Sequence, residues 1–272
     1  MRLGIFAKTF AGTDPAAVLA AVRQAGYETT QFNLACAGLP SMPDAMPADA
    51  IASVRAAAQS NGVSLAALSG TYNMAHPDKA VRDDGLRRLA VVIEAAAALG
   101  IPLVTLCTGS RNAADQWAYH PDNADPAAWS DMAAEMAKAL ALAEGAGVDL
   151  GIEPEQANIV TSARDATRLI AEMRSKHLKI VLDPANLFEH ATPGEARAIV
   201  AAAIDEAAGH IAMAHAKDRH GDGRFATSGQ GIVDFPDFVA RLKAAGFDGP
   251  LVSHGLSADE APDVAAFLRR LL

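Results

Sequence analysis

Short apolar runs alternate along this chain with longer segments in which apolar residues recur every three or four positions. The short runs are typical of buried strands, and the longer segments are typical of amphipathic helices. Eight runs fit strands, at 3–7, 29–34, 63–68, 102–107, 148–153, 179–183, 211–215 and 251–254. The pattern therefore predicts eight strand–helix units.

The expected helices carry their own start and stop residues. Asp14-Pro15, Asp125-Pro126 and Thr192-Pro193 are typical helix starts, and glycines such as Gly26 and Gly100 are typical helix ends. The expected helical segments run from 14 to 26, 48 to 60, 79 to 99, 126 to 145, from 162 onward, 193 to 207, 235 to 245, and through 264–271. Regular alternation predicts a parallel sheet, and eight units favour a closed (β/α)₈ TIM barrel over an open doubly wound sheet. The first strand–helix turn has no GxGxxG, which disfavours a dinucleotide-binding fold.

Length and composition fit a single TIM-barrel domain over residues 1–272. A barrel of this kind needs about 250 residues, and no composition break marks a second domain. The net charge of −9 and the lack of a basic run argue against a nucleic-acid partner. We expect no membrane span and no secretory leader, and hence a cytoplasmic protein. Cys36 and Cys107 form no CxxC pair, and we expect both to be reduced and buried.

Three consecutive strands switch abruptly from apolar residues to potential metal ligands. Glu153 ends "GIE", Asp183 ends "VLD", and His215 ends "AMAH". In a parallel barrel these strand ends meet at one rim. Buried carboxylates cost free energy unless they are paired or coordinate a cation. The mixed oxygen and nitrogen set predicts a divalent metal ion, and suits Mn²⁺, Mg²⁺, Co²⁺ or Zn²⁺ better than Ca²⁺.

Other polar residues follow the strands and are candidates for contacting a substrate. We expect this role for Asn33, Asn73, His76, Arg111, Glu155 and Asn186. Lys217 is a candidate for polarising a substrate oxygen or pairing with an acid. Each also has a simpler explanation as a helix cap or a solvated loop residue. The glycine-rich loop 218–233 could bring backbone N–H groups to an anion, and Trp117 and Tyr119 could form an apolar wall for a sugar or pack their loop.

Taken in order, the motifs resemble one family. "GIEPE" with Glu153, "VLDPAN" with Asp183, "HAKD" with His215 and the loop "GQGIVDF" resemble the xylose-isomerase-like barrels. That family includes sugar and sugar-phosphate isomerases and epimerases, inosose dehydratases and, more distantly, endonuclease IV. The resemblance spans essentially the whole chain, from "LGIFAKTF" to "LVSHGL". It implies a metal held by Glu153, Asp183, His215 and a further glutamate at the end of the eighth strand.

The chain departs from that pattern at the fourth ligand. The eighth strand ends in "LVSHGL", so His254 stands where the family usually places a glutamate. His254 is a candidate fourth ligand, a neutral neighbour of the ligands, or a base, because an imidazole titrates near neutral pH. Family epimerases use two opposed glutamates, and one of the two is missing here. Asn186 also stands where many relatives carry a histidine that contacts substrate.

The resemblance and the strand-end residues together predict a metal-dependent isomerase or epimerase. Its substrate would be a small keto-sugar, a sugar phosphate or a related hydroxy-carbonyl compound, converted through an enediolate. Glu153, Lys217 and His254 are the expected catalytic residues. The alternatives are a metal-dependent lyase, such as an inosose-type dehydratase or keto-sugar eliminase, and a non-catalytic sugar-binding relative. A DNA-repair nuclease is disfavoured by the charge. Members of the family often form homo-oligomers, so a homo-oligomer is a further possibility for this chain.

Overall fold

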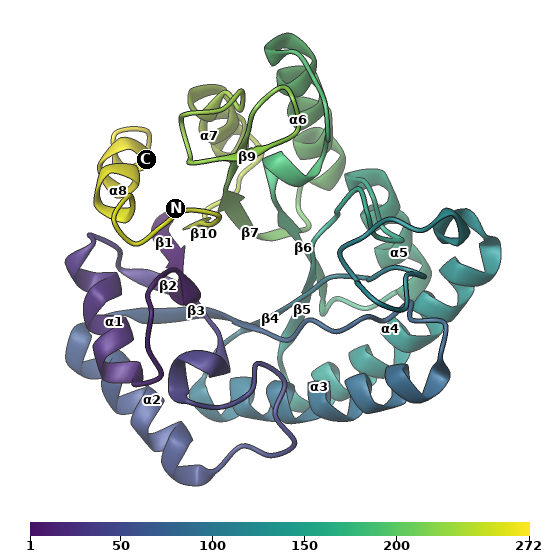
Figure 1. Cartoon of the computed structure of the whole chain (residues 1–272), viewed down its shortest axis with the longest axis horizontal. Coiled ribbons are helices and arrows are strands. Elements are labelled where there is room, and N and C mark those ends of the chain that lie inside the picture. Colours follow the sequence, from purple (N-terminus) through teal and green to yellow (C-terminus); the bar gives the residue numbers. More distant parts are fainter.

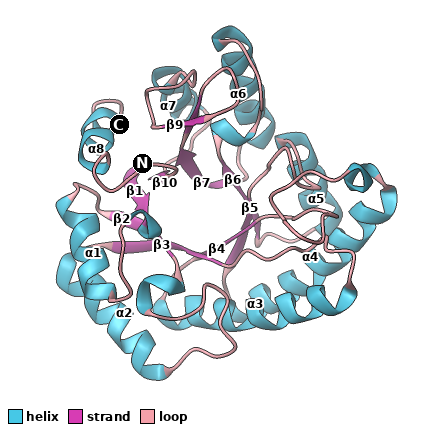
Figure 2. Cartoon of the chain, in the orientation of Figure 1, coloured by secondary structure: helices cyan, strands magenta, loops and turns pink.

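Eight parallel strands close into a barrel, and eight α-helices surround it (Figures 1 and 2). The computed structural model describes residues 1–272. The barrel strands are β1 (Arg2–Phe6), β2 (Thr29–Phe32), β3 (Ser64–Ser69), β4 (Leu103–Leu106), β5 (Asp149–Ile152), β6 (Leu178–Leu182), β7 (Ile211–Ala216) and β10 (Pro250–Ser253). The helices are α1 (Pro15–Gln24), α2 (Ala48–Asn61), α3 (Lys79–Leu99), α4 (Pro126–Ala146), α5 (Ala163–Met173), α6 (Pro193–Ala207), α7 (Phe235–Ala244) and α8 (Ala261–Arg269). The predicted fold class is confirmed.

Two kinds of short element lie outside the predicted pattern. Strands β8 (Asp218–Arg219) and β9 (Phe225–Ala226) form a small antiparallel hairpin in the loop after β7. Four short 3₁₀ helices occupy 7–9, 34–37, 121–124 and 184–186. Such elements span two to four residues each and are too short to create a hydrophobic period. No helix combines the length and the apolar composition that a membrane crossing requires.

The helix ends follow local side-chain chemistry. The carboxylates of Asp14 and Asp125 accept N–H groups at the starts of α1 and α4, and Thr192 with Glu195 forms a reciprocal capping box on α6. Helix α4 continues past Gly145, where the sequence suggested an end, and closes at Gly147, which adopts the left-handed conformation that glycine favours.

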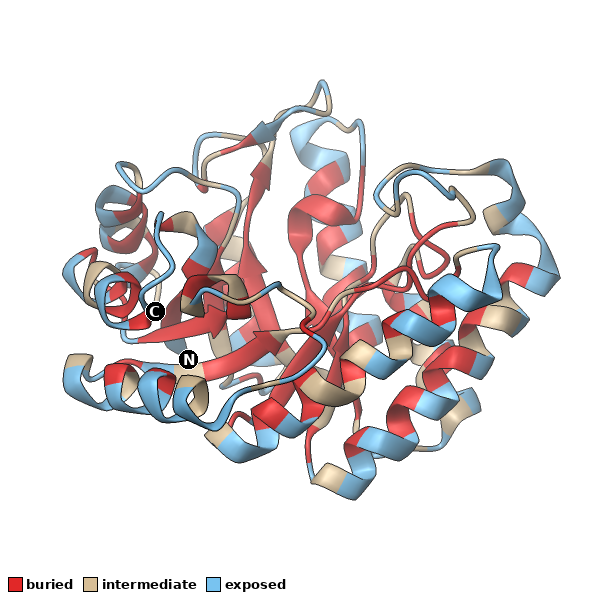
Figure 3. Cartoon of the chain, turned by 60° about the horizontal axis from the view of Figure 1, so that its bottom comes forward, coloured by how far each residue is buried: buried red, intermediate tan, exposed pale blue.

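The hydrophobic core has two parts. The larger part packs the outer face of the barrel against the helices, which leave their outer sides exposed (Figure 3). The smaller part fills the inside of the barrel with Ala67, Leu103, Val181, Met213 and Val252. Because that interior is full, β5 has a glycine facing it. A Cβ on Gly151 would lie 2.8 Å from Cγ2 of Val181 and 3.1 Å from Cδ1 of Leu103.

The apolar side chains that fill the inside of the barrel explain where the polar site lies. Side chains alternate along a strand with a period of two, so residues two positions apart point to the same face. Two residues beyond Gly151, Val181, Met213 and Val252 stand Glu153, Asp183, His215 and His254. The strands therefore deliver these four side chains to the barrel mouth, directly above an apolar floor.

Both cysteines are buried and form no disulfide. Burial raises the pKa of the Cys36 thiol to about 11, so this thiol is protonated at neutral pH. Its environment is that of a small apolar core side chain, as the sequence suggested.

Candidate functional site

Glu153, Asp183 and His215 converge at the carboxyl ends of β5, β6 and β7. Each offers one ligand atom, and these atoms lie within 4.8 Å of one another. Nδ1 of His215 is 3.3 Å from Oε1 of Glu153 and 3.3 Å from Oδ2 of Asp183. Asp183 and His215 are buried, and Glu153 is partly exposed toward the barrel mouth. The structure thus brings together the three residues that were predicted as metal ligands from the strand ends.

The orientation of His215 is set by Gln31, which the sequence analysis did not single out. Oε1 of Gln31 accepts a hydrogen bond from Nε2 of His215 at 2.9 Å. The amide nitrogen of Gln31 donates to the hydroxyls of Ser69 and Thr105, at 3.1 and 3.2 Å, which fixes the direction of the amide. Nε2 of His215 therefore carries the hydrogen, and Nδ1 faces the carboxylates. Metal-bound histidines are usually held this way by a second residue.

The charges of this group are strongly coupled. Burial lowers the pKa of His215, but the nearby Glu153 and Asp183 carboxylates outweigh it and raise the pKa to about 9. Burial opposes ionisation of Asp183, yet the charge of Lys217 and the hydrogen bond from His215 hold its pKa well below the usual range. The protonated imidazole of His215 thus lies between the two carboxylates, at a position where a metal cation could bind in place of the proton. Two carboxylate oxygens and one oriented imidazole nitrogen fit a divalent ion.

His254 lies beside this group and not within it. Its ring stacks on Phe6, with ring centroids 4.8 Å apart, and on His215, with centroids 5.0 Å apart. Nδ1 of His254 is buried and has no hydrogen-bond partner. Burial and the positive charges of His215 and Lys217 lower the pKa of His254 to about 3, so the imidazole is neutral. Its nitrogens are not among the ligand atoms that cluster within 4.8 Å.

A polar chain links Lys217 to the same group. Nζ of Lys217 donates to Oδ1 of Asn186 at 3.0 Å, and Nδ2 of Asn186 donates to Oε1 of Glu153 at 2.7 Å. Lys217 is only 9% exposed, so its ammonium is largely removed from water. Asn186 therefore holds one Glu153 oxygen and one cation at the same time.

The group opens into a pocket of about 540 Å³ at the barrel mouth. Six of the predicted site residues line it: Asn33, Glu153, Glu155, Asn186, Lys217 and His254. Glu155 follows the proline after β5 and lines this space. Burial and the charge of Glu153 raise the pKa of Glu155 to about 7.

Three predicted substrate contacts lie elsewhere, because Asn73, His76 and Arg111 are not among the pocket-lining residues. Asn73 exchanges hydrogen bonds with the backbone of Ser110, at 2.8 and 3.0 Å. Nε2 of His76 is 3.2 Å from the carbonyl of Ala113. Nη1 of Arg111 donates to a backbone carbonyl of the preceding βα loop at 3.2 Å. In the structure these side chains join the loop after β3 to the loop after β4.

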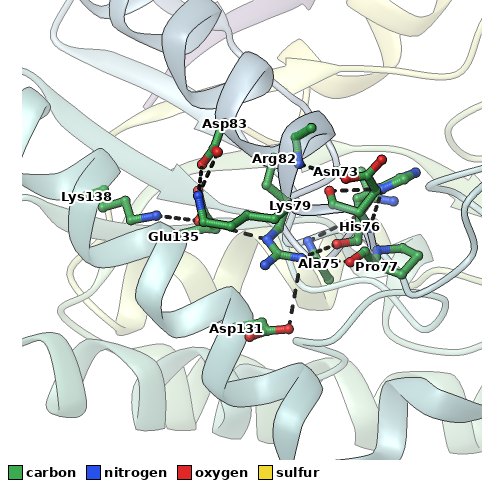
Figure 4. Close-up of polar contacts among 12 residues, drawn as sticks. Asn73, Ala75, His76, Pro77, Lys79, Arg82, Asp83, Asp131, Glu135 and Lys138 are labelled. Carbon is green, nitrogen blue, oxygen red and sulfur yellow. Dashed lines mark hydrogen bonds and ion pairs between the residues drawn. The ribbon is translucent and has the colours of Figure 1, made fainter.

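A buried ionic cluster between α3 and α4 supports the contact between the loops after β3 and β4 (Figure 4). Arg82 is 8% exposed and donates to the carbonyls of His76 and Pro77. Its Nε lies 3.9 Å from Oε1 of Glu135, and Lys138 bonds the same oxygen at 2.6 Å. Two long helices thereby hold the loop that carries Asn73 and His76.

The glycine-rich loop is organised around an internal anion. The buried carboxylate of Asp218 accepts the backbone N–H groups of Gly229, Gly231 and Val233 at 2.9, 2.8 and 3.0 Å. The suggestion that glycines of this loop present N–H groups to an outside anion is thus corrected for Gly229 and Gly231, whose N–H groups are already bonded to Asp218. The same arrangement anchors the β8–β9 hairpin, which brings Phe225 to the pocket.

The chain is a closed parallel barrel, and a glutamate, an aspartate and a histidine stand at the ends of three consecutive strands. These features place it in the class of parallel barrels with a candidate metal site at the mouth. The sequence profile of the xylose isomerase-like TIM barrel family matches residues 19–271. The chain therefore belongs to the xylose isomerase-like TIM barrel family. No curated protein sequence matches this chain.

Solved structures share this fold over nearly the whole chain. The 3-keto-D-glucoside 4-epimerase of E. coli superposes with a TM-score of 0.78 and 19% identity, covering 99% of both chains. An L-ribulose 3-epimerase gives a TM-score of 0.78 at 21% identity, covering 99% of this chain and 92% of the other. The D-psicose 3-epimerase of Clostridium cellulolyticum gives 0.75 at 17% identity, covering 100% of this chain and 99% of the other. At such identities the likeness is one of fold.

Proposed function

We propose that this protein is a metal-dependent isomerase or epimerase acting on a small keto-sugar or related hydroxy-carbonyl compound. The observation that carries the proposal is the Glu153–Asp183–His215 group, which opens into a pocket lined by a further carboxylate, Glu155, and by Lys217. The family membership and the names of the fold neighbours, which are sugar epimerases, support the same reading.

Glu153, Asp183 and His215 would hold the metal, and Gln31 would keep Nδ1 of His215 turned toward it. A divalent ion bound there would act as a Lewis acid toward a carbonyl oxygen of the substrate. Asn186 donates to Oε1 of Glu153 and so limits the motion of that ligand. The unpartnered Nδ1 of His254 is available either as a fourth ligand or as a proton acceptor.

Epimerisation beside a carbonyl needs groups that remove and return a proton. Glu155 lines the pocket but stands outside the ligand group, so its carboxylate is free to take the proton. Lys217 donates to Asn186 and also lines the pocket, so its ammonium is placed to stabilise negative charge on a substrate oxygen. His254 lines the same space and is the second candidate for the proton, although its lowered pKa makes it a weaker base than Glu155.

Elemental analysis tests the metal site first. We expect about one divalent ion per chain in the purified or reconstituted protein. The ion should be lost in Glu153→Ala and Asp183→Asn and kept in Asp263→Asn, a matched change at an exposed position of α8. Loss in His254→Ala identifies a fourth ligand, and retention leaves His254 free for proton transfer. A protein that holds no metal and gains none on reconstitution contradicts the proposal.

The reaction itself is tested by isotope exchange. Keto-hexoses and keto-glucosides are incubated with the metal-loaded protein in D₂O and followed by NMR. We expect deuterium at the carbon beside the carbonyl together with a new stereoisomer or a shifted carbonyl. Exchange should fall steeply in Glu155→Gln while the metal content stays unchanged. Turnover that survives complete removal of the metal would rule the mechanism out.

A lyase on the same barrel is the second candidate, and one observation favours it. The side chain at the end of β10 is the imidazole of His254, stacked between Phe6 and His215, where a two-carboxylate epimerase needs a glutamate. The same proton removal would then be followed by loss of a leaving group at the next carbon. Release of water and a new enone absorbance, without a stereoisomer, distinguishes this outcome from epimerisation.

A further inference from the structure

Two large aromatic side chains stand in the outer part of the pocket and stay open to solvent. Trp117 comes from the loop after β4 and is 48% exposed, and Phe225 comes from the β8–β9 hairpin and is 51% exposed. Both line the 540 Å³ pocket that contains the carboxylates. Single exposed apolar residues are common on surfaces, but two that line one concave site indicate a binding function.

Phe225 is held in place despite its exposure. Nζ of Lys217 lies 3.8 Å from its ring centroid, and the guanidinium of Arg219 lies 4.3 Å from it. Such cation–π contacts restrain the ring. The hairpin itself is anchored by the Asp218 carboxylate. The ring is thus restrained from the side of these two cations, and about half of the residue stays open for contact with a ligand.

The pocket is larger than one sugar ring requires. A water molecule takes about 30 Å³ of liquid volume, so the roughly twelve heavy atoms of a hexose fill at most about 360 Å³. The pocket measures about 540 Å³. The lining of this space includes Trp117 and Phe225, together with the polar residues Lys8 and Gln116.

We infer that the substrate is a glycoside with two rings, not a free monosaccharide. Its keto-sugar ring would sit at Glu153 and Glu155, and its second ring would stack on Trp117 and Phe225. Aromatic faces bind flat apolar ring surfaces, whether of an aryl group or of a second sugar. The inference rests on the proposed function for the identity of the inner ring, while the outer subsite rests on the two aromatic residues.

The sequence offers a built-in probe, because it has only two tryptophans. Trp129 lies on α4, donates to Glu172 at 2.8 Å and is covered by Arg168, 3.9 Å from its ring centroid. It is not among the residues that line the pocket. The Trp129→Phe variant therefore leaves Trp117 as the single emitter in the proposed subsite.

The test titrates Mn²⁺-loaded Trp129→Phe protein with phenyl β-D-glucopyranoside, cellobiose and glucose while following tryptophan emission. We expect phenyl glucoside, cellobiose or both to bind at least about tenfold more tightly than glucose, which is about 1.4 kcal/mol. Tighter binding of one two-ring ligand over the other identifies an aryl or a sugar second ring. Equal binding of all three, or binding of none, overturns the inference.

A second variant tests whether the preference comes from the aromatic platform. Phe225→Ala in the Trp129→Phe background should remove most of the preference for two-ring ligands. Tyr119→Ala is the matched control, since Tyr119 is 59% exposed and does not line the pocket. A preference that survives Phe225→Ala contradicts the inference.

The outcomes separate this inference from the proposed function. Deuterium exchange with no size preference leaves the function standing and removes the outer subsite. A size preference in a protein that holds no metal and exchanges no proton keeps the outer subsite as a glycoside-binding site and removes the proposed reaction.

Discussion

Gln31 of β2 and His215 of β7 are joined by a hydrogen bond of 2.9 Å across the barrel mouth. The two strands are not neighbours in the sheet, since β10 and β1 stand between them. The bond therefore spans the interior and fixes which nitrogen of His215 faces Glu153 and Asp183.

Replacing Gln31 with leucine should weaken metal binding without unfolding the protein. The change leaves Nε2 of His215 without its acceptor, so the ring loses its fixed orientation. We expect the affinity for Mn²⁺ to fall about 10- to 100-fold, as for other residues that hold a metal-bound histidine. Isothermal titration calorimetry measures it. Gln59→Leu, on the exposed face of α2, is the control, and equal affinities in the two variants would show that Gln31 has no such role.

Metal binding should release a proton, because the pKa of His215 is raised. Burial lowers this pKa, but Glu153 and Asp183 raise it from 6.5 to about 9. In the metal-free protein, the positive charge of His215 contributes to the free energy of unfolding. This contribution is complete below about pH 6.5 and is lost as the pH rises through 9. A metal ion must displace the proton, so the Kd for Mn²⁺ should fall about tenfold per pH unit between 6.5 and 8.5.

Calorimetry in two buffers of different ionisation enthalpy counts the protons directly. About one proton per Mn²⁺ is expected near pH 7.5. A Kd that does not change with pH, with no proton released, would mean that His215 is already neutral in the metal-free protein.

Removing the Glu135 charge should destabilise the protein far more than removing the Asp83 charge. Glu135 is 2% exposed and pairs with the buried Arg82, so Glu135→Gln leaves a buried cation poorly compensated. We expect a loss of about 3 kcal/mol in the free energy of unfolding. Asp83 pairs with Lys79 at the surface, and Asp83→Asn should change stability very little. Urea denaturation compares the two, and similar midpoints would contradict the structural role of the cluster.

Two glycine-to-alanine changes should shift stability in opposite directions. Gly151 faces the filled barrel interior, and a Cβ there would lie 2.8 Å from Cγ2 of Val181, so Gly151→Ala should cost about 1–3 kcal/mol. Gly145 lies inside α4 with nothing within 4 Å of an added Cβ, so Gly145→Ala should stabilise by about 0.5–1 kcal/mol. Thermal melts measure both. A harmless Gly151→Ala would indicate that the interior can yield.

The fold was predictable because each barrel strand carries its own apolar run and each helix its own period. The β8–β9 hairpin was not, since two strands of two residues leave no pattern. Gly145 was a misleading stop signal, because a glycine inside a helix looks the same in sequence as one at its end.

The convergence of Glu153, Asp183 and His215, the candidate metal ligands, was predictable because they end consecutive strands. Gln31 was missed although it lies within a predicted strand, since a lone amide there has no distinctive signal. Asn73, His76 and Arg111 were expected to face the substrate, yet their side chains bond to backbone groups of neighbouring loops, which depends on how two loops meet in space. The role of Asp218 was equally hidden, because its partners lie eleven to fifteen residues further along the chain.

Because the Asp218 carboxylate anchors the loop after β7, the tip of this loop can change in sequence without loss of the anchor. Its anchor bonds only to backbone N–H groups, so the sequence between Arg219 and Ser228 carries no side chain that the anchor needs. A barrel built this way can exchange the tip that bears Phe225 while the candidate metal ligands Glu153, Asp183 and His215 stay unchanged. Substrate range can thus diversify in a lineage, or in a laboratory library, separately from the chemistry at the floor of the pocket.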